Sequence, residues 1–234
     1  MAEIDVERVE PESAPISGAR ATFADGLTLL RALLTPVIMG LILWGWQATR
    51  EPGDYDIFQR MLDTSILASV LFGVAALSDA FDDLLGGAET AGYRRFGWFD
   101  DIADMILVVG TLIALLIVTY QSGALGLGLA IPAIVIIARE VIVGLVKGYE
   151  FSRTGWPDTI WGTIKNALAM VSTLLLVAAP WLTNWIDQMR AGDDVMQVFA
   201  SPSAYIWNIG LFGLWATAIL SVVTAVMLFA RPKA

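Results

Sequence analysis

The sequence predicts an all-α integral membrane protein with six transmembrane helices, and two observations support this fold class. Of the 234 residues, 57% are hydrophobic and only 16% are charged, which is too apolar for an ordinary soluble domain. Apolar stretches of about twenty residues, the length that a helix needs to cross the hydrocarbon core, recur along almost the whole chain. We therefore expect one six-helix membrane domain over residues 23–234.

The segment that precedes this domain, residues 1–22, is polar and acidic. It lacks a basic stretch followed by an apolar one, so we expect no cleavable signal and a first apolar run that stays in the protein. Its composition is typical of a solvated, disordered tail. The acidic residues are Glu3, Asp5, Glu7, Glu10 and Glu12.

Six apolar runs predict the membrane spans. The first contains Pro36, which a membrane helix tolerates when neighbouring helices satisfy the freed carbonyl. The second and third are joined by the short connection 86–97, which predicts an antiparallel hairpin of adjacent helices over about 64–120. The runs cover about 24–46, 64–85, 98–120, 125–146, 160–181 and 205–229.

Loop charges predict the orientation of these spans. An even number of spans places both termini on one side, together with the connection 86–97. Basic residues are more frequent in the loops on that side than on the other, so the positive-inside rule places both termini and this connection in the cytoplasm, with the chain in the inner membrane. Those residues are Arg8, Arg20, Arg94, Arg95, Lys147, Arg153, Arg231 and Lys233, against Arg50, Arg60 and Arg190 opposite.

The composition also limits the chemistry. The sequence has no cysteine and no histidine, which excludes disulfides, thiolate or histidine zinc sites and a Ser-His-Asp triad within this chain. The formal charge of −9 argues against a nucleic-acid partner, because such binding depends on lysine and arginine facing phosphates. Carboxylates and basic side chains must carry any chemistry.

Four aspartates of the predicted hairpin are the candidate site. Asp79 and Asp82 are three residues apart and Asp100 and Asp104 four apart, so each pair shares one face of its helix. A carboxylate near the membrane centre costs about 2.5 to 3.5 kcal/mol, and the two spans contain no lysine or arginine. Divalent cations are therefore the predicted counter-charges, and oxygen ligands favour Mg²⁺ or Mn²⁺. The alternative is that the aspartates only cap helix ends at the membrane interface.

This stretch, SDAFDDLLGGAETAGYRRFGWFDDIADMI, resembles the motif of the CDP-alcohol phosphatidyltransferase family, DxxDGxxAR followed after eight residues by GxxxDxxxD. All four motif aspartates are matched. The sequence departs from the motif at its small and basic positions. We therefore expect metal binding more firmly than binding of the cytidine nucleotide in the family's usual pose. Asp83 replaces a glycine, Gly86 an alanine and Gly87 an arginine, and Gly97 comes one place late.

Further segments are similar to the family, and in particular to phosphatidylglycerophosphate synthases. DGLTLLRALLTP looks like the entry to the first span, with Thr28 and Arg31 at the usual polar positions. Arg139, Lys147 and Lys165 match basic positions in AREVIVGLVKG and WGTIKNALAMV, whereas Thr163 stands where a lysine is usual.

The resemblance implies a reaction and a set of site residues. A phosphatidyl group would pass from a CDP-linked lipid to a small polar alcohol or polyol phosphate, best matched by glycerol 3-phosphate, with release of CMP. Two Mg²⁺ ions (or Mn²⁺) and a homodimer in the lipid membrane are also implied. The expected ligands of the metals are Asp79, Asp82, Asp100 and Asp104, with Asp104 also the general base. The expected donor-nucleotide residues are Asp79, Asp82, Asp83, Gly86, Gly97, Thr28 and Arg31. The expected acceptor-phosphate residues are Arg139, Lys147 and Lys165, with Arg31 a further candidate.

Two other function classes stay open at this point. The motif departures are compatible with an inactive or repurposed family member that binds metal and nucleotide. A cation transporter could use the aspartates as its ion site, although the sequence shows none of the duplicated halves that many transporters have.

Overall fold

The computed structural model describes residues 18–46, 55–84, 99–154, 160–191 and 204–229, and this part of the chain is almost entirely helical. Each helix contains an apolar window long enough to cross a membrane, which confirms the predicted all-α membrane fold. The helices are α1 (Gly18–Trp46), α2 (Tyr55–Leu84), α4 (Asp100–Gln121), α5 (Leu127–Thr154), α6 (Ile160–Ala191) and α8 (Tyr205–Phe229).

Two helices extend further than their apolar runs predicted. Helix α2 begins at Tyr55, and α6 continues through Pro180 to Ala191. Cation–π contacts attach both extensions to neighbouring helices. The guanidinium of Arg60 lies 5.8 Å from the ring centre of Trp44 in α1, and that of Arg190 lies 5.1 Å from the ring of Tyr205 in α8.

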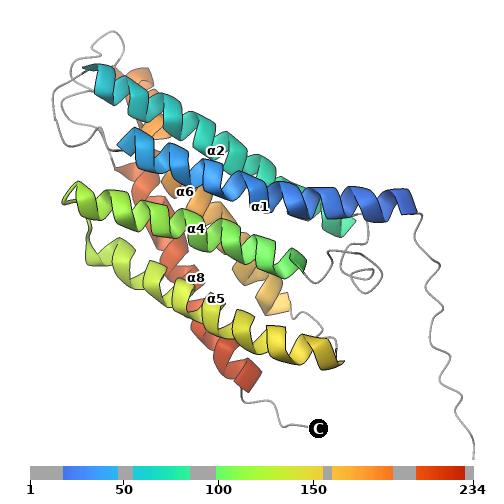
Figure 1. Ribbon diagram of the computed structural model, residues 1–234. Helices are drawn as coiled ribbons and strands as arrows, with labels where there is room; N and C mark the ends of the chain where they lie inside the picture. The colour runs from blue at the N-terminus through green and yellow to red at the C-terminus, as the bar shows by residue number, and fades with distance from the viewer. Residues whose placement is uncertain (1–17, 47–54, 85–98, 155–159, 192–203, 230–234) are drawn as a thin grey trace, which may run out of the picture.

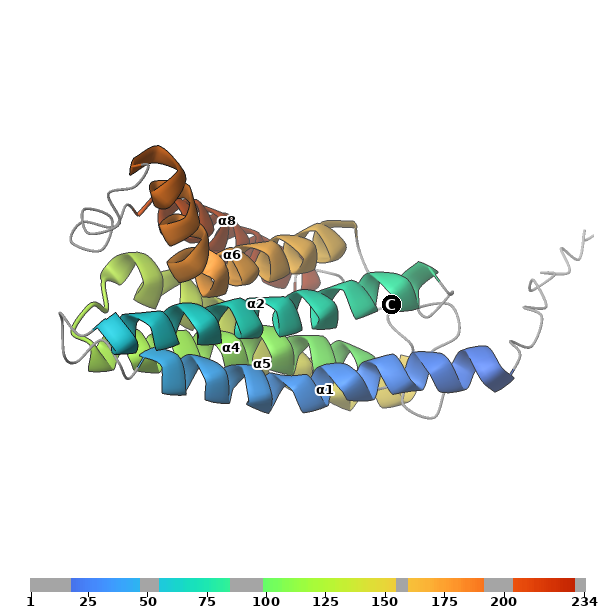
Figure 2. The same ribbon diagram turned by 90° about the horizontal axis from the view of Figure 1, so that it is seen from above.

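The helices run alternately up and down (Figure 1). Helices α1, α4 and α6 begin at the same end of the bundle at which α2, α5 and α8 finish, and the view in Figure 2 agrees. We call this the proximal end and the opposite one the distal end. The first and last described helices therefore have their outer ends on one side, as an even number of spans requires.

The predicted hairpin of α2 and α4 is antiparallel, but α1 separates its two helices over much of their length. Helix α1 packs extensively against both, whereas α2 and α4 touch each other little. The expectation of directly adjacent helices is thus only partly met. Helix α1 carries Arg31, whose buried side chain needs partners inside the bundle.

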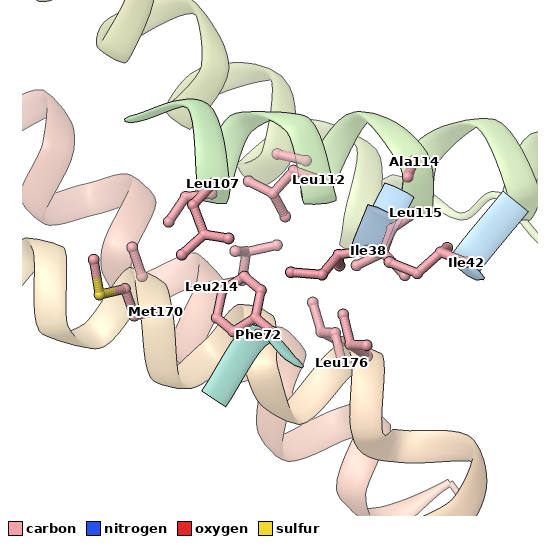
Figure 3. Packing of buried hydrophobic residues seen from close by; sticks show 14 of the residues in the cluster. Ile38, Ile42, Phe72, Leu107, Leu112, Ala114, Leu115, Met170, Leu176 and Leu214 are labelled. Atoms are coloured by element: carbon pink, nitrogen blue, oxygen red, sulfur yellow. The ribbon is translucent and has the colours of Figure 1, made fainter. Parts of the chain in front are cut away.

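Apolar side chains fill the centre of the bundle. Figure 3 shows Ile38 of α1, Phe72 of α2, Leu115 of α4, Leu176 of α6 and Leu214 of α8 converging in this core. All of them are fully buried, whereas many large apolar residues on the outer faces are exposed, as lipid-facing helices require.

Small residues set the closest helix contacts. A Cβ added to Gly213 of α8 would lie 2.3 Å from Ser172 Oγ of α6, and one added to Gly210 would lie 2.9 Å from the Leu176 side chain. Such positions let helix backbones approach closely in a membrane. At the distal end Gly123 has φ of 71°, and this turn returns α5 alongside α4.

Candidate active site

Helices α1, α2 and α4 meet at a single nitrogen atom near the proximal end. Nη1 of Arg31 donates a hydrogen bond to Oδ1 of Asp79 at 2.9 Å and another to Oδ1 of Asp104. The two carboxylates, predicted to face each other across the hairpin, are therefore neighbours. We call Arg31, Asp79 and Asp104 the acidic cluster, because it contains two carboxylates and one cation.

Arg31 lies in α1, outside the predicted hairpin, and supplies the positive charge between Asp79 and Asp104. Its side chain is fully buried, whereas Asp79 and Asp104 are 25% and 16% exposed. The structure pairs Arg31, a predicted donor-nucleotide or acceptor-phosphate residue, directly with two predicted metal ligands. An ionisable residue inside an apolar helix usually faces the bundle interior. Applied to α1, that rule predicts that Arg31 points into the bundle, toward the carboxylates of the neighbouring helices.

Thr28 and Thr35 lie one turn on either side of Arg31. The hydroxyl of Thr28 donates to the carbonyl of Ala24 at 3.3 Å, and that of Thr35 to the carbonyl of Arg31 at 3.0 Å. All three side chains are buried. Thr28 therefore shares the helix face that presents Arg31 to the acidic cluster.

Several predicted site residues are placed only by their backbone or not at all. Asp82 and Asp83 lie near the end of α2, Asp100 begins α4, and Lys147 lies in α5, but their side chains are outside the described part of the chain. Gly86 and Gly97 lie outside the described residues altogether. Among the side chains that are described, no three carboxylates form a metal-ion site.

The described carboxylates nevertheless fit the donor set expected of Mg²⁺ or Mn²⁺. Asp79 and Asp104 bring oxygens from two helices to a common cationic group, and oxygen donors are those that these ions prefer. Positions 82 and 100 lie one helical turn nearer the proximal end.

A second charged cluster connects α5, α6 and α8. Oε1 of Glu140 accepts hydrogen bonds from Nζ of Lys165 and from Nη1 of Arg139, the latter at 3.0 Å. Nη2 of Arg139 donates to Oγ1 of Thr224 at 3.3 Å. We call Arg139, Glu140 and Lys165 the basic cluster, because it contains two cations and one carboxylate.

The structure brings together Arg139 and Lys165 as predicted acceptor residues, but it also adds Glu140 and Thr224. Sequence reasoning gave neither of these a role. Glu140 could have been found by the rule for ionisable residues within membrane helices. Thr224 gives no comparable signal, because a threonine in an apolar helix usually only donates to a carbonyl of its own helix.

The two clusters lie at the same end of the bundle. Met105 follows Asp104 in α4, and Gly144 lies one turn beyond Glu140 in α5. A Cβ added to Gly144 would lie only 3.1 Å from Sδ of Met105. Helices α4 and α5 therefore approach closely near the proximal end, where both clusters lie.

A groove of about 520 Å³ lies between α2 and α6, away from both clusters. It is lined by Gln59, Ile66, Trp181, Trp185 and Gln188 among others. Nε1 of Trp181 donates to Oγ of Ser69 at 3.0 Å. These residues belong to the distal halves of α2 and α6, so the groove is separate from the candidate site.

Comparison with known proteins supports the resemblance found in the sequence. The model of the CDP-alcohol phosphatidyltransferase family matches residues 21–223. A CDP-diacylglycerol--glycerol-3-phosphate 3-phosphatidyltransferase from Pseudomonas fluorescens is 28% identical over 169 residues, which cover 68% of this chain and 74% of that protein. A protein of the same name from Salmonella choleraesuis is 26% identical, and the match covers 69% of this chain and 78% of that protein. Another from Escherichia coli K12 is 30% identical, and the match covers 51% of this chain and 64% of that protein.

Proposed function

The chain belongs to the CDP-alcohol phosphatidyltransferase family, and we propose that it transfers a phosphatidyl group from CDP-diacylglycerol to glycerol 3-phosphate, releasing CMP. One observation carries the proposal most directly. Toward the same end of a membrane bundle lie a cluster with excess carboxylate and a cluster with excess cation. The first suits divalent metals and the second suits a phosphate, which are the two requirements of this reaction.

The donor half of the site is assigned to the carboxylates. Asp79, Asp82, Asp100 and Asp104 would hold two Mg²⁺ or Mn²⁺ ions. When bound, such ions neutralise charge on the diphosphate and on the departing CMP. Thr28, Arg31 and Asp83, together with Gly86 and Gly97, complete the proposed surroundings of the donor nucleotide. The buried guanidinium of Arg31 holds the carboxylates of Asp79 and Asp104 close together in the absence of a ligand.

Asp104 is the proposed general base. The acceptor hydroxyl attacks the phosphorus that bears the diacylglycerol and gives its proton to the Asp104 carboxylate. A bond forms from the acceptor oxygen to this phosphorus, while the bond from phosphorus to the bridging diphosphate oxygen breaks. The bonding electrons leave with CMP. The contact with Arg31 orients Asp104 from the neighbouring helix.

The acceptor half is assigned to the basic cluster and Lys147. Arg139 and Lys165 carry one more positive charge than Glu140 neutralises. Nε of Arg139 is buried and has no hydrogen-bond partner among the described residues, and a bound phosphate oxygen would satisfy this donor. The names of the relatives, which include glycerol 3-phosphate, favour the same acceptor over a neutral alcohol and favour an active enzyme over a non-catalytic family member.

The proposed location is the inner membrane with the proximal end in the cytoplasm. The excess of loop lysine and arginine on that side supports this orientation. Cytosolic substrates such as glycerol 3-phosphate would then reach both clusters directly, while the lipid donor enters from the bilayer.

An acceptor screen tests the proposal. Purified protein would be incubated with CDP-diacylglycerol, Mg²⁺ and glycerol 3-phosphate, glycerol, serine, inositol or inositol phosphate. We expect CMP release and a phosphatidylglycerophosphate mass only with glycerol 3-phosphate, and loss of both signals with a chelator. CMP release only with a different acceptor would overturn the acceptor assignment. A complete lack of CMP release with all of these acceptors would overturn the donor assignment.

A further inference from the structure

We propose that Glu140 and Thr224 are positioning residues, which fix Arg139 and Lys165 at the separation needed to recognise a phosphate monoester. The inference rests on the proposed function, which makes these cations the acceptor site, and it assigns the site's specificity to two residues outside the sequence motif. It also gives α8, which contains no charged residue, a part in substrate recognition.

Glu140 determines how far apart the two cations lie. A single oxygen, Oε1, accepts hydrogen bonds from Lys165 of α6 and from Arg139 of α5. Lys165 is only 3% exposed, and in such surroundings an ion pair must be well matched to offset the loss of solvation. Without the shared carboxylate, the two cations would repel each other and separate.

Thr224 fixes the orientation of the Arg139 guanidinium. Its hydroxyl hydrogen is directed at the helix backbone, since Oγ1 donates to the carbonyl of Leu220 at 2.8 Å. The oxygen's lone pairs therefore remain for Nη2 of Arg139, 3.3 Å away. With Nη1 on Glu140 and Nη2 on Thr224, the planar fork cannot turn, and Nε keeps one fixed direction.

This arrangement selects for the charge and shape of the ligand. A phosphate monoester supplies several oxygens to accept bonds from fixed N–H donors. A neutral alcohol would leave those donors unsatisfied in a largely buried site, which is costly. The recognised phosphate is also retained in the product, so the cluster serves substrate binding and does not participate in bond breaking.

A matched pair of threonine substitutions tests the role of Thr224. Thr224→Val removes the contact to Arg139, and the control Thr217→Val removes a hydroxyl two turns earlier in α8 that donates to the carbonyl of Gly213 at 2.9 Å. We expect Thr224→Val to raise the KM for glycerol 3-phosphate about threefold to tenfold. Its kcat and its KM for CDP-diacylglycerol should stay within about twofold, as should all three parameters of Thr217→Val.

Glu140→Gln tests the shared carboxylate with a side chain of nearly the same shape. We expect the KM for glycerol 3-phosphate and the Ki of inorganic phosphate, as competing ligand, to rise together by roughly tenfold or more. A lower KM would show that Glu140 competes with phosphate and would overturn its positioning role. An unchanged KM in Thr224→Val, or an equal change in Thr217→Val, would overturn the role of Thr224.

Direct binding separates this inference from the proposed function. Inorganic phosphate should raise the unfolding temperature of the wild-type protein and of Thr217→Val by more than that of Thr224→Val. If the wild type did not use glycerol 3-phosphate but this difference persisted, the proposed acceptor would be wrong and the phosphate-positioning role would stand. Equal shifts in the two variants would contradict the inference whatever the acceptor.

Discussion

The acidic and basic clusters have the same number of charged side chains and opposite compositions. Arg31 is shared by Asp79 and Asp104, whereas Glu140 is shared by Arg139 and Lys165. In the acidic cluster one cation contacts two carboxylates, and in the basic cluster one carboxylate contacts two cations. Each is thereby held together without being fully neutralised, which leaves one cluster disposed to take up cations and the other to take up anions.

Burial differs between the clusters in an informative way. In both, a cation is the most buried member, Arg31 in the first and Lys165 in the second. The partly exposed members are carboxylates in the acidic cluster, but Arg139 and Glu140 in the basic cluster. The more exposed groups are thus the two carboxylates in one case and the guanidinium with its carboxylate partner in the other.

Removal of carboxylate charge should have the largest effect on turnover. Asp104→Asn should lower kcat by about 10² to 10⁴, as expected for loss of a general base, while measurable Mg²⁺ binding remains. Asp79→Asn and Asp100→Asn should abolish turnover and weaken Mg²⁺ binding, measured by calorimetry. Wild-type-like turnover in either of the latter two variants would refute the metal assignment.

Replacement of Arg31 tests whether the acidic cluster needs its internal cation. Arg31→Met leaves Asp79 and Asp104 facing each other, and breaking a buried ion pair in this way costs about 3 to 5 kcal/mol. We expect a lower unfolding temperature in chelator, with Mg²⁺ restoring stability to the variant by more than it adds to the wild type. The control Arg60→Met, which loses the cation–π contact with Trp44, should cost about 0.5 to 1 kcal/mol and show no such rescue. Equal Mg²⁺ effects on Arg31→Met and the wild type would contradict this role.

Replacement of Lys165 tests the opposite cluster. Lys165→Met keeps most of the side-chain volume but leaves Arg139 and Glu140 as a neutral pair. The KM for glycerol 3-phosphate should rise roughly a hundredfold, because a buried charge contact with the ligand is lost, and the KM for CDP-diacylglycerol should change little. Steady-state kinetics with each substrate varied in turn would measure both, and an equal rise in the two constants would argue against separate donor and acceptor clusters.

The smallest expected effect concerns the close approach of α4 and α5. In Gly144→Ala the new methyl group would lie 3.1 Å from Sδ of Met105, and this flexible side chain can move by a few tenths of an ångström. We expect kcat/KM to fall by no more than about threefold, with unchanged KM for CDP-diacylglycerol. A loss as large as that of Lys165→Met would show that the spacing of α4 and α5 is itself critical.

The sequence by itself determined the membrane fold and the chemistry available to it. Long apolar runs leave a chain few options other than spanning helices, because only these satisfy their backbone polar groups within the bilayer. The spacing of Asp79 with Asp82 and of Asp100 with Asp104 follows helix periodicity, which is local and therefore readable from sequence. The match to the family motif used the same local information.

Only the tertiary structure decided which charges meet. Arg31 is 48 residues from Asp79 and 73 from Asp104 along the chain, and Arg139 is 85 from Thr224. No local pattern records these pairs, since they depend on α1 packing between α2 and α4 and on α8 packing against α5 and α6. Sequence periodicity places a side chain on a face of its own helix, whereas its partner is set by how the helices pack together.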